Sequence, residues 1–235
     1  MSAAILRPVL IPAAAAAVAH AGPALSAWSP ALRRAFGVRA TVADPGGVAL
    51  TFDDGPHWHG TPATLERLRE AGATATFFLV GEQVERRPAL VAEIVAAGHA
   101  IGIHGQRHRN LLRVGPRATA DDLRHAHDRI ADASGQAPLL YRPPYGVLSA
   151  AALATARRAG WETVLWARWG RDWRARATAA SIAAEATEGL RGGEIVLLHD
   201  ADYYSTAGSW RATVEALPRI LAAIGEAGLR TVTLR

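Results

Sequence analysis

The 235-residue sequence contains neither cysteine nor lysine. Without cysteine, a disulfide framework and a thiolate metal site are both excluded, so any metal must be bound by histidine and carboxylate side chains. Without lysine, the basic charges behind the formal net charge of +5 come from arginine alone. These arginines are scattered along expected helices and do not cluster with aromatic residues. This distribution argues against a nucleic-acid partner and favours biased composition as the cause of the basic charge.

The sequence also lacks a Gly-x-Gly-x-x-Gly motif after its first expected strand, which is the main sequence signature of a dinucleotide-binding fold. Half of the residues are hydrophobic, so the chain can bury a full core. Residues 46–235 contain no linker rich in Ser, Gly or Pro and no internal repeat. We therefore expect them to form one catalytic domain.

Residues 1–45 differ from the rest of the chain. The stretch from Ile5 to Val18 is apolar, but Pro8 and Pro12 interrupt it, and it is shorter than the roughly 20 residues that span a bilayer. The Ala-His-Ala pattern that ends at Ala21 is one that a signal peptidase accepts. These features leave open an exported or membrane-associated protein, and equally a cytoplasmic one in which the segment is a helix packed on the domain.

Strand-like and helix-like patterns alternate from residue 48 onward. We expect strands at Val48–Phe52, Thr74–Val80, His99–His104, Leu139–Arg142, Thr163–Ala167, Glu194–His199 and Arg230–Leu234. Helices rich in Ala, Arg and Leu are expected between them, at Thr61–Ala71, Arg87–Ala97, Thr119–Ser134, Ser149–Ala159, Thr178–Leu190 and Trp210–Ala227. This alternation predicts a parallel sheet with right-handed crossovers. Because polar residues gather just after strand ends, we expect an α/β barrel, incomplete since about seven strands are visible.

Two adjacent carboxylates, Asp53 and Asp54, follow the first expected strand. At a buried strand end they repel each other and lose hydration, so they need a cation or a proton. The alternative is a simple turn, because Asp-Asp-Gly-Pro has good turn chemistry.

Two histidines four residues apart, His104 and His108, follow the third expected strand. On a helical turn their rings would face one side and could share one cation, although solvated loop histidines are the alternative. Together with one carboxylate they would supply three ligands and leave positions open, which is typical of a catalytic metal site. His57 and His59, after the first strand, are expected to be surface loop residues.

Three later strand ends also carry polar or aromatic groups. Arg142 precedes a rigid Pro-Pro-Tyr145-Gly loop, which can aim a backbone N–H at a developing oxyanion, while an arginine beside a carboxylate keeps the carboxylate ionised. An exposed arginine on a structural loop is the alternative. The tryptophans between Trp166 and Trp173 form either a substrate wall or a cap on the core. His199 is a candidate general acid.

Five motifs, in this order and strand context, resemble those of the polysaccharide deacetylases, the NodB-homology domains of carbohydrate esterase family four. They are Thr51-Phe-Asp-Asp-Gly-Pro56, His104-x-x-x-His108, Arg142-Pro-Pro-Tyr-Gly146, Asp172-Trp173 and Leu197-x-His199. The resemblance covers residues 46–235 and implies a distorted, incomplete (β/α) barrel. It also implies a metal-dependent hydrolase that removes N-acetyl groups from an N-acetylated glycan or sugar and releases acetate.

The resemblance further implies a role for each matching residue. One divalent metal, usually zinc, is expected on Asp54, His104 and His108. Asp53 is expected to be the general base, and Arg142 to orient it. The backbone N–H of Tyr145 is expected to bind the oxyanion, and His199 to be the general acid. The substrate side of the site, including a small apolar pocket for the acetyl methyl group, is expected to comprise Trp173, Leu197 and Asp172.

Two positions depart from the family pattern. Gly105 stands where the family usually has Ser or Thr after the first metal histidine, which removes a hydroxyl close to the ligands. Trp169 stands three residues before the Asp-Trp pair, where members often carry an aspartate that supports the acid histidine. We then expect another group, such as Asp172 or Asp200, to orient His199, or the pKa of His199 to be set differently.

Two other functions compete with this prediction. The same metal site could serve a lipid-linked sugar or a non-sugar amide, and the apolar N-terminal segment would suit the former by holding the enzyme near a membrane. Alternatively, the chain could be a glycan-binding pseudoenzyme. The intact base and ligand set argues against this reading, whereas Trp169 argues for it.

Overall fold

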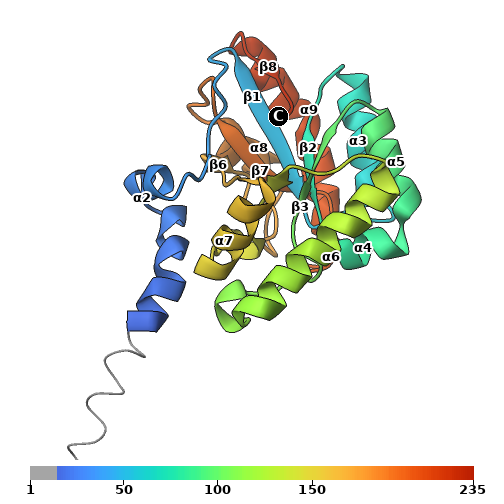
Figure 1. Ribbon diagram of the computed structural model, residues 1–235. Coiled ribbons are helices and arrows are strands. Elements are labelled where there is room, and N and C mark those ends of the chain that lie inside the picture. The colour runs from blue at the N-terminus through green and yellow to red at the C-terminus, as the bar shows by residue number, and fades with distance from the viewer. Residues whose placement is uncertain (1–14) are drawn as a thin grey trace, which may run out of the picture.

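A curved parallel sheet forms the centre of the computed structural model, which describes residues 15–235 (Figure 1). Its strands are β1 (Gly47–Asp53), β2 (Thr76–Leu79), β3 (Ala100–Ile103), β4 (Leu140–Tyr141), β5 (Glu162–Thr163), β6 (Arg168–Trp169), β7 (Ile195–His199) and β8 (Arg230–Thr231). They follow the order β5-β4-β3-β2-β1-β7-β6, and β8 pairs with the start of β1. These strand pairs are all parallel. The predicted α/β class and incomplete barrel are thereby confirmed.

Helices cover the outside of this sheet (Figure 1). They are α3 (Gly60–Glu70), α4 (Gly81–Arg86), α5 (Pro88–Ala96), α6 (Pro116–Ser134), α7 (Ala150–Ala159), α8 (Ala179–Thr187) and α9 (Ser209–Glu226). Short 3₁₀ turns η2 (Leu111–Arg113) and η3 (Pro144–Gly146) lie in the loops after β3 and β4. Each of the six predicted helices is present within a few residues of its expected limits. Strand β6 and helix α4 were not predicted, because two and six residues are too few to show a period.

Strand β1 is the central element of the sheet because it has neighbours on both sides. All seven of its residues are buried, as its continuous apolar pattern indicates. Phe52 stacks on Phe77 of β2 with ring centroids 5.1 Å apart. On the other side, Asp53 is in register with His199 of β7. This register brings a carboxylate and a histidine that are far apart in sequence to one end of the sheet.

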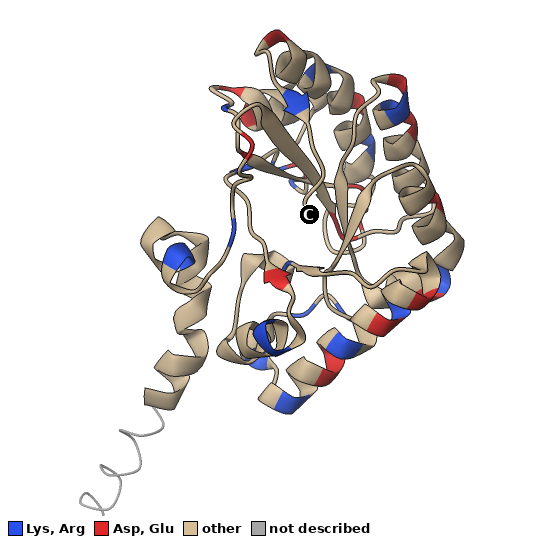
Figure 2. Cartoon of the chain, turned by 45° about the horizontal axis from the view of Figure 1, so that its top comes forward, with Lys and Arg blue, Asp and Glu red and all other residues tan. Residues whose placement is uncertain are grey.

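Charged residues are distributed over the outer helices, with both signs interspersed along α6 (Figure 2). Several form ion pairs three residues apart on one helix, such as Arg67 with Glu70 and Arg124 with Asp121, each at 2.8 Å. This is the arrangement of solvated helix faces.

The N-terminal segment joins the open side of the sheet at residues 39–42, whereas its first helix extends away from the sheet (Figure 1). Residues 15–21 are helical, and η1 (Gly22–Ala27) and α2 (Pro30–Ala35) follow. The backbone N–H of Arg39 donates to the carbonyl of Thr163 at the end of β5, and the N–H of Val42 donates to the carbonyl of Gly193 before β7. This segment therefore bridges two parts of the sheet that do not pair with each other. Most of the apolar stretch from Ile5 to Val18 lies outside the described residues. Within residues 15–235, no helix is long and apolar enough to cross a bilayer.

Candidate active site

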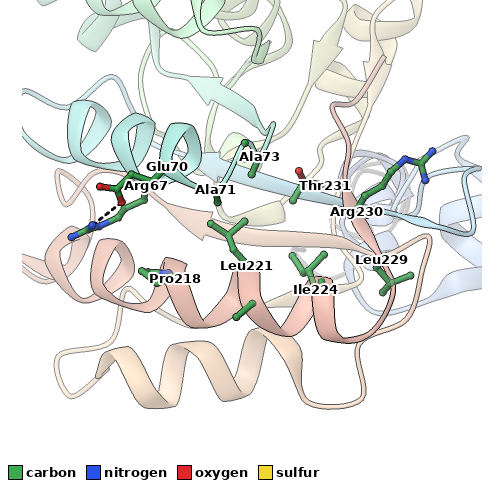
Figure 3. A pocket seen from close by; sticks show the side chains of 13 residues that line it. Arg67, Glu70, Ala71, Ala73, Pro218, Leu221, Ile224, Leu229, Arg230 and Thr231 are labelled. Atoms are coloured by element: carbon green, nitrogen blue, oxygen red, sulfur yellow. Dashed lines mark hydrogen bonds and ion pairs between the residues drawn. The ribbon is translucent and has the colours of Figure 1, made fainter.

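Two cavities at opposite ends of the sheet differ in their chemistry. One of about 520 Å³ lies at the amino ends of the strands between α3, α9 and β8 (Figure 3). Its lining includes Leu221 and Ile224 of α9, and the Arg67–Glu70 ion pair lies at one end (Figure 3). The other, of about 250 Å³, lies at the carboxyl ends of the strands. All predicted site residues except Arg142 and Asp172 line this second cavity: Asp53, Asp54, His104, His108, Tyr145, Trp173, Leu197 and His199.

Three side chains in this cavity form a cluster that can hold a metal ion. The ligand atoms of Asp54, His104 and His108 all lie within 4.8 Å of one another. Oδ1 of Asp54 is 3.4 Å from Nε2 of His104 and 3.2 Å from Nε2 of His108. This oxygen is buried and has no hydrogen-bond partner among the described residues. Nδ1–H of His104 donates to the carbonyl of Arg142 at 2.8 Å, which leaves the lone pair on Nε2 directed toward Asp54. Converging electron-pair donors with an orphaned carboxylate oxygen fit a bound divalent cation.

The protonation states of the cluster suit metal binding. Burial raises the pKa of Asp54, but the close approach of the His104 ring and the charges of His199, His108 and His104 outweigh it and lower this pKa to about 2. Burial lowers the pKa of His108 to about 4, against the opposing charge of Asp54. At neutral pH the carboxylate is therefore ionised and the imidazole neutral, the forms in which both bind metal.

The second carboxylate of the pair is held by a buried arginine. Nη1 of Arg142 donates to Oδ1 of Asp53 at 2.7 Å and to the hydroxyl of Thr51 at 2.8 Å. Arg142 is fully buried, and its guanidinium carbon lies 4.0 Å from the ring centroid of Phe78. Such a charge-assisted contact fixes the direction of the carboxylate. Arg142 thus lies behind the cavity wall, and the alternative of an exposed arginine was wrong.

Tyr145 occupies an unusual backbone conformation in η3. Its φ is 60°, in the left-handed region that non-glycine residues rarely adopt. The preceding Pro143 and Pro144 and the following Gly146, whose φ is 68°, define this turn. A Cβ on Gly146 would lie 2.8 Å from the Trp166 ring, so only glycine fits there. Strained backbone of this kind is concentrated at functional sites.

Asp172 is the residue that orients His199. Nδ1–H of His199 donates to Oδ1 of Asp172 at 2.8 Å, and the backbone N–H of His199 donates to Oδ2 at 2.7 Å. The hydroxyl of Thr213 also donates to Oδ2, at 2.8 Å. Asp172 is 1 % exposed and lies behind the histidine. Its predicted place on the substrate side of the site is therefore corrected to a position beneath the candidate acid.

This pairing changes the acidity of His199. Burial lowers the pKa of the imidazole, but the charge and hydrogen bond of Asp172, with the charges of Asp54 and Asp53, outweigh it and raise the pKa to about 10. His199 is therefore a cation at neutral pH and has a proton to give. Asp200, the other candidate partner, instead accepts a hydrogen bond from Thr61. Burial raises the pKa of this fully buried carboxyl to about 7.

Three tryptophans form one wall of the cavity. The ring centroids of Trp166 and Trp169 are 6.0 Å apart, and those of Trp169 and Trp173 are 5.6 Å apart. Trp173 contacts His199 edge to face at 5.5 Å. All three line the cavity, and Trp166 also packs against the core, so the two predicted roles of wall and core cap coexist.

Comparisons with known proteins agree with these observations. Residues 41–164 match the family described as polysaccharide deacetylase. The chain is 38% identical over 191 residues to a peptidoglycan-N-acetylglucosamine deacetylase of Bacillus cereus, covering 80% of this chain and 85% of that protein. The chain belongs to the polysaccharide deacetylase family. The predicted family and its activity, metal-dependent hydrolysis of N-acetyl groups on glycans, are thereby confirmed.

Two further relatives are similar to this deacetylase over most of its length. It is 39% identical over 169 residues to a chitooligosaccharide deacetylase of a Bradyrhizobium species, covering 70% of this chain and 77% of that protein. The crystal structure of a peptidoglycan N-acetylglucosamine deacetylase superposes with a TM-score of 0.81 at 30% identity, covering 88% of this chain and 95% of that one. The family fold thus extends over nearly all of the described residues.

Two residues of the deacetylase differ from what their sequence context suggests. His57 is buried instead of lying on the surface: its Nδ1 accepts from the N–H of Gly60 at 2.8 Å and its Nε2 lies 3.3 Å from Asp202. Tyr204 is not among the residues that the motifs single out, yet it lines the cavity and stacks on His108. The only sequence signal for it is a Tyr-Tyr pair shortly after the polar exit of the strand that ends in His199.

Proposed function

We propose that this deacetylase binds one zinc ion at Asp54, His104 and His108 and removes acetyl groups from N-acetylglucosamine units of a glycan chain. The observation that carries the proposal is the convergence of three groups around one cavity: the ligand cluster, Asp53 backed by Arg142, and His199 backed by Asp172. Two imidazoles with one carboxylate favour zinc over magnesium or calcium, which prefer oxygen ligands throughout. A bound zinc ion supplies polarisation of the acetyl carbonyl and a lowered pKa for the attacking water.

Each remaining role belongs to a group of the chain. Asp53, aimed by Arg142, accepts a proton as water attacks the amide carbon. The backbone N–H of Tyr145 donates to the oxyanion that forms there. As the C–N bond breaks, Nε2–H of His199 gives its proton to the leaving amine. The immediate products are acetic acid and the free amino sugar. Acetic acid loses its proton to solvent and becomes acetate, Asp53 gives up the proton it took from water, and His199 regains one from solvent, so atoms and charges balance.

The walls of the cavity suit a small acyl group. Leu197 and Trp173 lie beside His199, where the methyl of an acetyl group would be shielded from water. The named relatives act on peptidoglycan and on chitooligosaccharides. N-acetylglucosamine is common to both substrates, which supports it as the unit recognised here.

Acetate release from N-acetylglucosamine oligomers tests this function directly. We expect protein stripped of metal with a chelator to release none, and added zinc to restore release. Magnesium should restore much less, because it binds imidazole poorly. Metal bound at the cluster without acetate release from any N-acetylated oligomer would refute the proposed reaction and favour a non-sugar amide or the binding-only alternative.

We further propose that the N-terminal segment attaches the enzyme to an anionic membrane surface. Val18, Leu25 and Trp28 are among the most exposed large apolar side chains in residues 15–235. The segment carries Arg33 and Arg34, and the sequence has no acidic residue before Asp44. Exposed Trp and Leu next to arginine are typical of segments that lie in the lipid interface.

Sedimentation with lipid vesicles measures this attachment. The protein is expected to bind vesicles that contain anionic lipid and to bind neutral ones weakly. Replacing both Leu25 and Trp28 by serine should reduce the bound fraction severalfold, whereas Leu139→Ser, at another exposed apolar side chain, should not. Equal binding of all three proteins would count against the proposal.

A further inference from the structure

We infer that Tyr204 is a positioning residue for His108, and that ring stacking holds this metal ligand where a hydrogen bond would normally hold it. The inference rests on the proposed metal site and concerns how that site keeps its affinity. Tyr204 lies in the loop between β7 and α9, five residues beyond His199.

The two ligand histidines are supported in different ways. A histidine that binds metal through one ring nitrogen usually donates from the other to a carbonyl or carboxylate, which fixes the plane of the ring. His104 follows this rule, because its Nδ1–H donates to the carbonyl of Arg142 at 2.8 Å. Nδ1 of His108 is buried and has no hydrogen-bond partner among the described residues. Something else must fix the plane of the His108 ring.

Aromatic contacts take that place. The rings of His108 and Tyr204 stack face to face, with centroids 4.3 Å apart and planes inclined by 10°. The ring of Tyr145 meets His108 edge to face, also at 4.3 Å and with an inclination of 67°. Rotation of the imidazole out of its plane would break the stack and collide with one of the two rings. The stack therefore holds Nε2 in the direction of Asp54, 3.2 Å away.

Tyr204 is itself anchored at the other end of its side chain. Its hydroxyl donates to Oε1 of Glu82 at 2.6 Å and accepts from Nε2 of Gln83 at 3.2 Å. Both partners lie in the first turn of α4. The ring is thus fixed between a helix end and the ligand.

The same helix end holds the loop that carries the ligands. The backbone N–H groups of Gly81 and Glu82 donate to the carbonyls of Gly105 and Gln106, each at 2.9 Å. A Cβ on Gly81 would lie 2.0 Å from Oε1 of Gln106, so the loop is packed directly on the helix. The first turn of α4 therefore aligns His108 twice, through the backbone of its loop and through Tyr204.

Zinc affinity of the metal-free protein tests this role independently of activity. Competition with a chromophoric chelator gives the zinc dissociation constant of three proteins: the parent, Tyr204→Leu and Tyr204→Phe. Thermal unfolding of each metal-free protein checks that it is folded. We expect Tyr204→Leu to weaken zinc binding by about tenfold or more, the usual effect of losing a group that orients a ligand. Tyr204→Phe keeps the ring and should stay within about threefold of the parent.

Tyr203→Leu is the matched control. The Tyr203 ring meets the edge of Tyr204 at 6.2 Å but packs mainly on His57 and Arg87 and makes no ring contact with His108 among the described residues. Its zinc affinity should equal that of the parent. Unchanged affinity in Tyr204→Leu would overturn the inference, and so would an equal loss in Tyr203→Leu or in Tyr204→Phe. A parent protein that binds no zinc would instead overturn the proposed metal site, so the two failures are distinguishable.

Discussion

Asp53→Asn is expected to lower kcat for acetate release by about 10²–10⁴-fold, the usual contribution of a general base. The asparagine amide can still accept the hydrogen bond that Nη1 of Arg142 now donates to Oδ1 at 2.7 Å, so the side chain keeps its direction. It cannot take a proton from water at neutral pH. The metal ligand Asp54 is not altered, so zinc affinity should change by less than about tenfold. Steady-state acetate release at saturating zinc measures the effect.

Stability is the necessary second measurement for this variant. Arg142 is fully buried and pairs with Asp53, so removing the carboxylate charge leaves a buried cation without its partner. Loss of one partner of such a pair costs about 3–5 kcal/mol, and the unfolding temperature should fall accordingly. Asp121→Asn is the matched control, because it makes the same chemical change in an exposed ion pair of α6. A folded, zinc-loaded Asp53→Asn protein with the kcat of the parent would show that Asp53 is not the base.

Asp172→Asn is expected to move the alkaline limb of the pH profile of kcat/KM from about pH 10 toward pH 6.5. His199 acts only when protonated, and the charge of Asp172 is the largest influence that raises the pKa of this histidine to about 10. Without that charge, burial lowers the pKa toward or below the ordinary value of 6.5. At pH 8 the protonated fraction, and with it kcat/KM, should then fall by about thirtyfold. The measurement is kcat/KM at fixed zinc between pH 6 and 10.5.

Thr213→Val controls for the lost hydrogen bond. It removes one donor to Oδ2 of Asp172 but leaves the carboxylate charge, so the alkaline limb should remain close to that of the parent. An Asp172→Asn protein whose alkaline limb coincides with that of the parent would refute the role of Asp172.

The same pair contributes to the pH dependence of unfolding. The folded pKa of His199 lies above its unfolded value, so the pair stabilises the fold fully below about pH 6.5, and this contribution is lost as pH rises through about 10. The difference in unfolding free energy between parent and Asp172→Asn should therefore shrink as pH rises through that window.

Much of this site follows from the chain itself. Asp53, His104, Arg142 and His199 each stand at the end of a short apolar stretch, between patterns typical of helices. In a parallel sheet the carboxyl ends of all strands lie on one side, so residues at those ends must meet there. The chemistry of the meeting groups then indicates metal, base and acid before any contact is known.

Elements that are too short to show a pattern depend on their surroundings. Helix α4 has six residues and its conformation is stabilised by contacts of its N–H groups with the loop after β3. Strand β6 has two residues, and pairing with β7 makes it a strand. The segment at residues 39–42 is fixed in the same way, by backbone bonds to Thr163 and Gly193.

The sequence by itself determined the parallel α/β fold, the family and the residue types available for catalysis. Only the tertiary structure decided which carboxylate serves His199 and what supports His108. Asp200 directly follows His199 in the sequence, and Asp172 belongs to another of the five motifs. Side chains at successive positions near a strand end point to opposite sides. Asp200 therefore turns away from the His199 side chain and meets Thr61, while Asp172 reaches the histidine from the loop after β6. Tyr204 likewise reaches His108 from a separate loop, the one between β7 and α9. Contacts between separate strand ends depend on distances in the folded sheet, and spacing along the chain does not encode them.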